Sequence, residues 1–177
     1  EEALSVQRQA LKLAGQRLGP RHRETLQVAT ALGGTLRSAG RLEEAEALHR
    51  RAFQGLAAVL GPENRDTLTS ANNLGLVLEG QGRLGEAEQL YRRARVGLTQ
   101  ALGEGSPATL SATFNLASVL TQLAVTGGRS GVAAEAEPLH REALVGRERA
   151  FGLASPQVSE SREALAAHLL LPQIATG

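Results

Sequence analysis

Residues that could carry catalysis or bind a metal are few in this chain of 177 residues. It has no cysteine, a single aspartate, Asp66, and four histidines, of which His22 and His168 have no obvious acid or nucleophile partner. The HExxH metal motif, the GxSxG nucleophile elbow and any Cys–His arrangement are absent from the sequence. We therefore expect a protein that is not an enzyme, with no catalytic residue, cofactor or metal site.

Two other features could suggest a ligand site. His49 and His140 occupy equivalent positions of a repeat, with Tyr91 at the position between them. Because the three lie in different repeat units with no cysteine or second histidine nearby, packing between helices is the better interpretation. The stretch TGGRSG at 126–131 lacks the GxxxxGK[ST] spacing and the lysine of a phosphate-binding loop, so it is interpreted as a flexible insertion.

Arginines recur on one helix of each repeat and could form a ridge that binds phosphate. Glutamates precede them by four residues, a spacing that favours ion pairs along a helix. The pairs with this spacing are Glu46 and Arg50, Glu88 and Arg92, and Glu137 and Arg141. A solvated charged face is therefore favoured over a nucleic-acid site.

A repeat sets the arrangement of the whole chain. At least fifteen residues of 61–103 recur 42 positions earlier, and the spacing then lengthens to 49 residues between Ala87 and Ala136. A period between 20 and 50 residues indicates an array of stacked units. Each unit has a first helix and a second helix, and the glycines at 55, 97 and 146 recur in the middle of second helices. Close backbone approach and composition bias both explain these glycines.

The repeat divides the chain into six segments. The start, with apolar Val6, Ala10, Leu11 and Leu13, fits a second helix, so the chain begins in mid-repeat. The seven extra residues of the last full unit lie in 124–132, which is predicted to be a loop because of its Gly and Ser. Leu171 and Pro172 are expected to end the last helix. The segments are 1–18 (second helix of an incomplete unit), 22–60, 64–102, 106–151 (with the insertion in its turn), 155–171 (terminal first helix) and 172–177 (tail).

Composition limits the partners. Hydrophobic residues make up 42%, charged residues 21%, and the net charge is +1, so no general attraction to nucleic acid or to an anionic membrane is expected. No apolar run approaches the roughly 20 residues that span a bilayer. The acidic, amphipathic start does not resemble a signal peptide. We expect no nucleic-acid or membrane partner and a cytoplasmic location.

The residues Leu74, Gly75, Leu78, Gly82, Leu84, Ala87, Tyr91 and Ala94 match the tetratricopeptide repeat pattern. The stretch TLTSANNLGLVLEGQGRLGEAEQLYRRA, followed by LG, resembles the 42-residue repeats of kinesin light chains. The coiled-coil heptads that join those chains to the motor are absent from this sequence. The resemblance implies an all-α, right-handed superhelical solenoid of antiparallel helix pairs, here about eight helices, with a concave groove lined by the first helices.

In that family a partner peptide lies in the groove, and the resemblance places the groove residues by register. Asn72 is the strongest match, because the family uses such an amide to bond peptide backbone. Thr30 and Phe114 depart from that pattern, and a carboxylate clamp would need lysines at these groove positions, where the chain has none. The implied groove residues are Gln27, Thr30, Arg37, Thr69, Asn72, Leu76, Glu79, Ser111, Phe114, Ser118 and Thr121.

Two functions follow as expectations. The first is a non-catalytic adaptor or scaffold that binds a protein or peptide ligand in its groove, with cargo binding as one form of this role. The second is a structural segment of a longer solenoid or sensor arm, which would associate end to end through its half-repeats.

Overall fold

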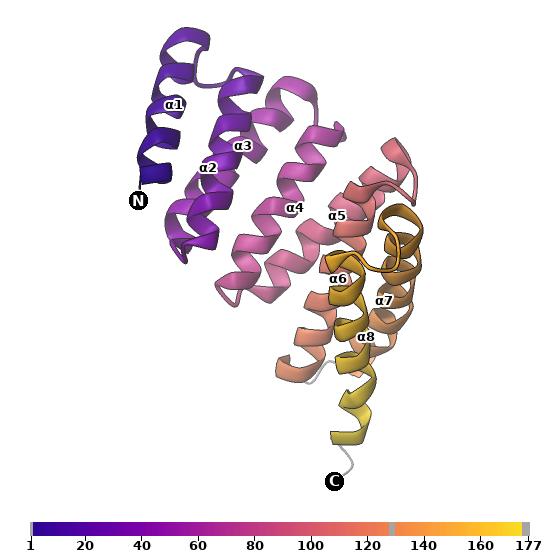
Figure 1. Ribbon diagram of the computed structural model, residues 1–177. Helices are drawn as coiled ribbons and strands as arrows, with labels where there is room; N and C mark the ends of the chain where they lie inside the picture. Colours follow the sequence, from indigo (N-terminus) through magenta and orange to yellow (C-terminus); the bar gives the residue numbers. More distant parts are fainter. Residues whose placement is uncertain (1, 128–129, 175–177) are drawn as a thin grey trace. The chain divides into compact units, whose positions relative to one another are not determined.

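The computed structural model describes residues 2–127 and 130–174, and in these residues it contains eight α-helices and no strand (Figure 1). The all-α class and the number of helices expected from the repeat are confirmed. The helices are α1 (Glu2–Leu18), α2 (Arg23–Ser38), α3 (Leu42–Leu60), α4 (Arg65–Gly80), α5 (Leu84–Leu102), α6 (Pro107–Gly127), α7 (Ser130–Phe151) and α8 (Pro156–Ile174).

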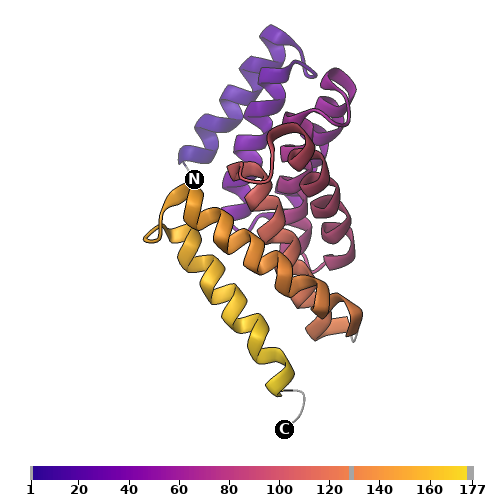
Figure 2. The ribbon, with the colours of Figure 1, turned by 90° about the vertical axis from the view of Figure 1, so that its right-hand side faces the viewer.

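These helices form two compact units: unit 1 spans residues 1–83 and contains α1–α4, and unit 2 spans residues 84–177 and contains α5–α8. In each unit every helix packs on the next one in the chain, as Figure 2 shows for α7 (orange) and α8 (yellow). The first helices also contact each other, α2 with α4 and α6 with α8. The grouping of α4 with α5 in one repeat, 64–102, crosses the division between the units and stays a prediction.

The turns recur because the same residues close them. Gly61 follows α3 with a φ of +91°, a left-handed conformation that glycine adopts without strain. Its carbonyl oxygen accepts a hydrogen bond from the hydroxyl of Thr67, in the first turn of α4, at 2.9 Å. In unit 2 the carbonyl of Gly103 accepts the same bond from Thr109, also at 2.9 Å. The recurring threonine therefore ties α4 and α6 to the turns before them, whereas the equivalent hydroxyl of Thr25 in α2 has no hydrogen-bond partner among the described residues.

The cores follow the predicted apolar stripes. In unit 1 the buried cluster contains Leu4, Leu32, Leu36, Ala45 and Val77. In unit 2, α6 contributes the corresponding leucines, and the equivalent alanine of α7 is fully buried. These residues are Leu110, Leu116, Leu120 and Ala136.

Glycine in the second helices allows a close approach. A Cβ added at Gly55 would lie 2.7 Å from the side chain of Leu26, and one added at Gly146 would lie 2.2 Å from Leu110. Both distances are too short for carbon atoms in van der Waals contact. The neighbour is in both cases a leucine side chain of the preceding first helix, so these two glycines make room for a side chain, and the expected close approach of two backbones is not seen at them.

The predicted apolar stripe of α1 is wrong in three of its four residues. Val6, Ala10 and Leu13 are exposed, with 62% of Val6 and 45% of Leu13 accessible to solvent. The face that packs on unit 1 instead carries Leu4, which is buried, and Leu11, which is half-buried. The reason is that α1 packs mainly on α2, so only one side of the helix is covered.

The predicted loop at 124–132 is also wrong for most of its residues. Residues 124–127 continue α6, and residues 130–132 belong to the first turn of α7. Positions 128–129 lie outside the described residues. The insertion therefore lengthens both helices of the pair, because adding backbone hydrogen bonds at a helix end needs no new nucleus.

Two further expectations need correction. Helix α8 continues past Pro172 to Ile174, and residues 175–177 of the expected tail lie outside the described residues. One described segment, Pro107–Thr126 of α6, has a length of 20 residues and a mean hydropathy of 1.3, which corrects the expectation that no apolar run approaches the length of a membrane span. Half of this segment is buried inside the protein, as the core helix of a packed domain would be.

Candidate functional site

The predicted groove residues of unit 1 lie on the two first helices that contact each other. We call this surface the first-helix face of unit 1: Gln27, Thr30 and Arg37 of α2, with Thr69, Asn72, Leu76 and Glu79 of α4. Three of these residues are exposed, three are half-buried, and Asn72 is 7% exposed. The exposed ones are Gln27, Arg37 and Thr69.

The threonines of this face already use their hydroxyl protons. Thr30 donates to the carbonyl of Leu26 at 3.0 Å, and Thr69 donates to that of Arg65 at 2.8 Å. A threonine oxygen has two acceptor lone pairs, so each remains able to accept a bond from a ligand. The first-helix face thus offers hydroxyl acceptors, an amide, an exposed cation on Arg37 and one half-buried apolar side chain, Leu76.

In unit 2 the predicted groove residues lie on α6, but two of them are engaged inside the unit. Ser111 and Ser118 are half-buried. Phe114 is only 8% exposed, and the guanidinium of Arg147 lies 4.0 Å from the centre of its ring. The imidazole of His140 meets the same ring edge-on, with 6.3 Å between centroids.

Arg147 is a buried cation held by several acceptors. It is 5% exposed, and its Nη1 donates to the hydroxyl of Ser161 at 2.9 Å, the carbonyl of Gln157 at 3.0 Å and the carboxylate of Glu160 at 2.9 Å. Burial lowers the pKa of Arg147, and the hydrogen bond and charge of Glu160 oppose that shift. The contact with Phe114 has the geometry of a cation–π interaction.

Thr121, the last predicted groove residue, lies between two histidines. Its Oγ1 donates to the carbonyl of Ala117 at 3.0 Å, and the same oxygen is 3.1 Å from Nε2 of His140 and 3.0 Å from Nδ1 of His168. The roles of the two ring nitrogens depend on the tautomer of each histidine; because the hydroxyl has a single proton, at least one imidazole donates to this oxygen. The Nδ1 of His140 is buried and has no hydrogen-bond partner in the described part of the chain.

This Thr–His–His cluster corrects the expectation that His168 has no partner. His140 and His168 are 1% and 6% exposed, so substrate cannot reach them. Asp66, in unit 1, is paired with Arg23 and Arg65.

The recurring His49, Tyr91 and His140 are buried side chains in their helices, with 2%, 0% and 1% exposed. Their interpretation as packing residues is confirmed by this burial. No group of three or more metal-ligating residues occurs in the part of the chain that the structure describes.

The charged face expected on the second helices is present. All three pairs with four-residue spacing form, and the bonds between Arg92 and Glu88 and between Arg141 and Glu137 measure 2.9 and 2.8 Å. In unit 2, Arg92 also binds Glu135, and Arg95 binds Glu142 at 2.9 Å. These bonds between α5 and α7 were not predicted, since they depend on how the two helices lie together.

The buried Arg147 was also missed, although the repeat contains a signal for it. Its equivalents in the two preceding repeats are Leu56 and Leu98, both buried. An arginine in an otherwise leucine position indicates either an exposed site or a cation with buried acceptors. The acceptors could not be found from the sequence because they lie on another helix, α8.

Comparison with known proteins identifies the family. One tetratricopeptide repeat model matches three stretches of the chain, residues 1–58, 32–99 and 66–124. A second model with the same description matches residues 116–157. The chain therefore belongs to the tetratricopeptide repeat family. No curated protein matches it.

Solved structures with kinesin light chain-like repeats share the fold. One is a candidate kinesin light chain of Podosopora anserina with nearly identical TPR-like repeats, at 20% identity and a TM-score of 0.73. A single-substitution variant of that protein gives a TM-score of 0.75, and in both cases the match covers 94% of this chain and 76% of the other. BtubC (BKLC) of P. vanneervenii matches at 22% identity with a TM-score of 0.76, and this chain spans 64% of its length.

Proposed function

We propose that this chain is a non-catalytic interaction module that binds an extended segment of a partner protein along the first-helix face of unit 1. The observation that carries the proposal is that two adjacent first helices expose polar groups along the same face, with Gln27, Arg37 and Thr69 all exposed. The tetratricopeptide fold supports it, since repeats of this kind leave an extended surface for a partner chain.

Each group on this face has a role that its chemistry allows. The amide of Asn72 both donates and accepts; it is 7% exposed and already interacts with another group of the protein, so only its remaining hydrogen-bonding capacity is offered to a peptide backbone. Leu76 offers an apolar contact, and Arg37 favours a ligand carboxylate. The proposal extends to Ser111, Phe114, Ser118 and Thr121 of unit 2. Because Phe114 and Thr121 make contacts inside that unit, substitution there tests stability as well as binding.

Site-specific crosslinking tests the proposal. A photoreactive phenylalanine placed at Gln27 or Thr69 should crosslink a partner segment that the same residue at Glu43, exposed on α3, does not. Mass spectrometry of the crosslink defines that segment, and its synthetic peptide should bind Arg37→Ala and Leu76→Ala more weakly than Glu43→Ala. Equal crosslinking at both faces, or unchanged affinity in the variants, would contradict the proposal.

The exposed apolar residues favour a second candidate, self-association as part of a longer array. On α1, Val6 and Leu13 are exposed, and on α8, Leu169 and Leu170 are 41% and 52% exposed. Exposed leucines on a helix face favour packing on another helix. Light scattering after size exclusion should then show a molar mass that rises with concentration and falls in Val6→Glu/Leu13→Glu. A constant monomer mass would exclude this candidate.

A further inference from the structure

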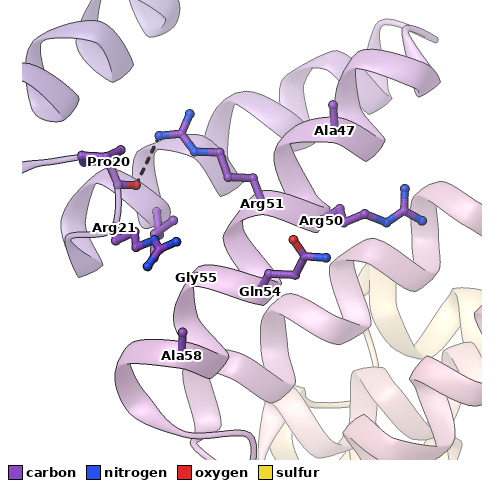
Figure 3. Close-up of a pocket in the computed structure, with 9 residues that line it drawn as sticks. Pro20, Arg21, Ala47, Arg50, Arg51, Gln54, Gly55 and Ala58 are labelled. Carbon is purple, nitrogen blue, oxygen red and sulfur yellow. Dashed lines mark hydrogen bonds between the residues drawn. The ribbon is translucent and has the colours of Figure 1, made fainter.

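A pocket of about 470 Å³ lies in unit 1, away from the residues of the first-helix face (Figure 3). The side chains of α3 line most of it, including Arg51, Gln54 and Ala58, and Arg21 closes it from the turn before α2. Leu26 of α2 contributes to its inner wall where Gly55 has no side chain. Its volume is within the range of about 300–1,000 Å³ that ligand sites have.

Two cations at this pocket lack an acidic partner. Arg51 donates to the carbonyl of Pro20 at 3.2 Å, and in the described residues neither Arg21 nor Arg51 has a carboxylate partner. Figure 3 shows both near Pro20, whereas the neighbouring Arg50 points away from them and pairs with Glu46. Arginine binds carboxylates through a fork of donors, so two unpaired guanidinium groups favour an anionic ligand.

Unit 2 repeats the pocket but not its charge. The equivalent pocket, of about 680 Å³, is lined by Leu110 and Gly146, and a glycine, Gly105, replaces Arg21. Glu142 replaces Arg51 and binds Arg95. Arg141, paired with Glu137, and Arg149 also line the unit 2 pocket, so the two pockets differ in where their charges lie: unit 1 has arginines at positions 21 and 51, and unit 2 has a glycine and a paired carboxylate there.

We propose that the pocket of unit 1 is a second binding site that takes an acidic peptide, with a Glu or Asp carboxylate on Arg21 and Arg51. An apolar side chain next to that carboxylate covers the apolar wall that the exposed Ala58 contributes, Leu26 being already buried, and the exposed amide of Gln54 bonds the peptide backbone. A free phosphate would satisfy the arginines but would leave this apolar wall open to water, which makes a peptide the better occupant.

The test is a fluorescence-anisotropy titration of the full chain with a labelled Gly-Ser-Glu-Leu-Glu-Ser-Gly peptide. Arg21→Glu/Arg51→Glu should weaken binding by at least about tenfold, because charged hydrogen bonds are lost and like charges are introduced. The matched control, Arg141→Glu/Arg149→Glu, reverses two charges at the equivalent pocket of unit 2. Its affinity for the peptide should stay within about twofold of the wild-type affinity. Ala58→Phe, which fills the pocket without changing its charge, should weaken binding as well.

Three results would overturn the proposal. The first is equal affinity for the same peptide with Gln in place of Glu. The second is a loss of peptide affinity in the unit 2 control, Arg141→Glu/Arg149→Glu, that is as large as the loss in Arg21→Glu/Arg51→Glu. The third is binding that depends on Arg37 and not on Arg21 and Arg51, which would place the peptide on the first-helix face. Circular dichroism of each variant confirms that its helices are intact.

Discussion

The layer of buried side chains on the second helices differs between the two units. At one equivalent position, unit 1 has Leu56 and unit 2 has Arg147. Both residues are buried. The following first helices, α4 and α8, carry serines at equivalent positions: Ser161 accepts a hydrogen bond from Arg147, and the hydroxyl of Ser70 is buried without a partner. The comparison shows that one backbone arrangement holds either an apolar or a charged layer, provided that the charged one finds acceptors.

A second difference accompanies the first. The residue that faces this layer from the first helix is Thr30 in unit 1 and Phe114 in unit 2. Phe114 covers the guanidinium of Arg147 and also meets His140, whereas Thr30 bonds its own helix. The larger Phe114 of unit 2 thus replaces Thr30 of unit 1, and one aromatic ring covers the charge of Arg147.

The largest expected effect is a loss of unit 2 stability in acid. Burial, with a smaller contribution from the charge of His168, lowers the pKa of His140 to about 4. Its unfolded value is near 6.5, so the stability is complete above pH 6.5, falls as the pH drops towards 4 and then levels off, by up to about 3 kcal/mol. Urea unfolding at several pH values measures this change.

His140→Asn should remove most of this dependence. Burial also lowers the pKa of His49, so unit 1 should lose stability in acid for the same reason. His49→Asn should reduce that loss of stability. If neither variant changes the pH profile between 6.5 and 4, the buried histidines do not control acid stability.

The next effect tests the charged layer directly. Arg147→Ala should destabilise the protein by about 2–3 kcal/mol, because the ring of Phe114 loses its cover and the acceptors on α8 lose their donor. Arg147→Leu, which copies unit 1, should stay within about 1 kcal/mol of the wild type. Chemical denaturation measures both, and equal losses in the two variants would show that the bonds matter more than the packing.

A smaller effect concerns the equivalent carboxylates Glu46 and Glu137. Glu46 accepts bonds from Gln81 at 2.9 Å, from Arg83 at 2.7 Å and from Arg50, and although burial raises its pKa, these bonds lower it to about 2. Among the residues that the structure describes, Glu137 pairs only with Arg141, and both side chains are exposed to solvent by more than 40%.

Glu46→Gln should therefore cost about 1–2 kcal/mol at pH 7, and Glu137→Gln less than about 0.5 kcal/mol. The stability that comes from the Glu46 carboxylate is present above pH 4.5 and is lost as the pH falls through 2. Thermal unfolding compares the two variants. Equal decreases in the midpoint temperature would show that Glu46 and Glu137 contribute equally to stability.

The smallest effect has opposite signs in the two units. Ser161→Ala should destabilise by about 1 kcal/mol, because Arg147 loses one acceptor. Ser70→Ala should be neutral or stabilise by up to about 1 kcal/mol, since it removes a buried hydroxyl that has no partner. Urea denaturation separates the two, and a clear loss in Ser70→Ala would mean that its hydroxyl is satisfied.

The fold could be predicted closely because its signals are local and repeated. Gly61 and Thr67 recur as Gly103 and Thr109, and the turn contacts they make span only six residues. The arginine face followed from four-residue spacing within single helices. The exposed side of α1 could not be predicted, because an apolar stripe does not tell how many neighbours a helix has.

The candidate site was less predictable. Register placed Gln27, Arg37 and Thr69 on exposed positions, but it could not show that Phe114 is covered by Arg147 or that Thr121 binds His140. These contacts join residues that are 19 or more positions apart on different helices.

The sequence by itself determined the repeat, the helix pairs and the tetratricopeptide family, because turn residues and apolar spacing act within a few positions of the chain. Only the tertiary structure decided which polar side chains remain free for a partner. That choice depends on which helices lie together: Arg51 and Arg147 are both arginines on second helices, and α8 supplies acceptors to one of them and not to the other.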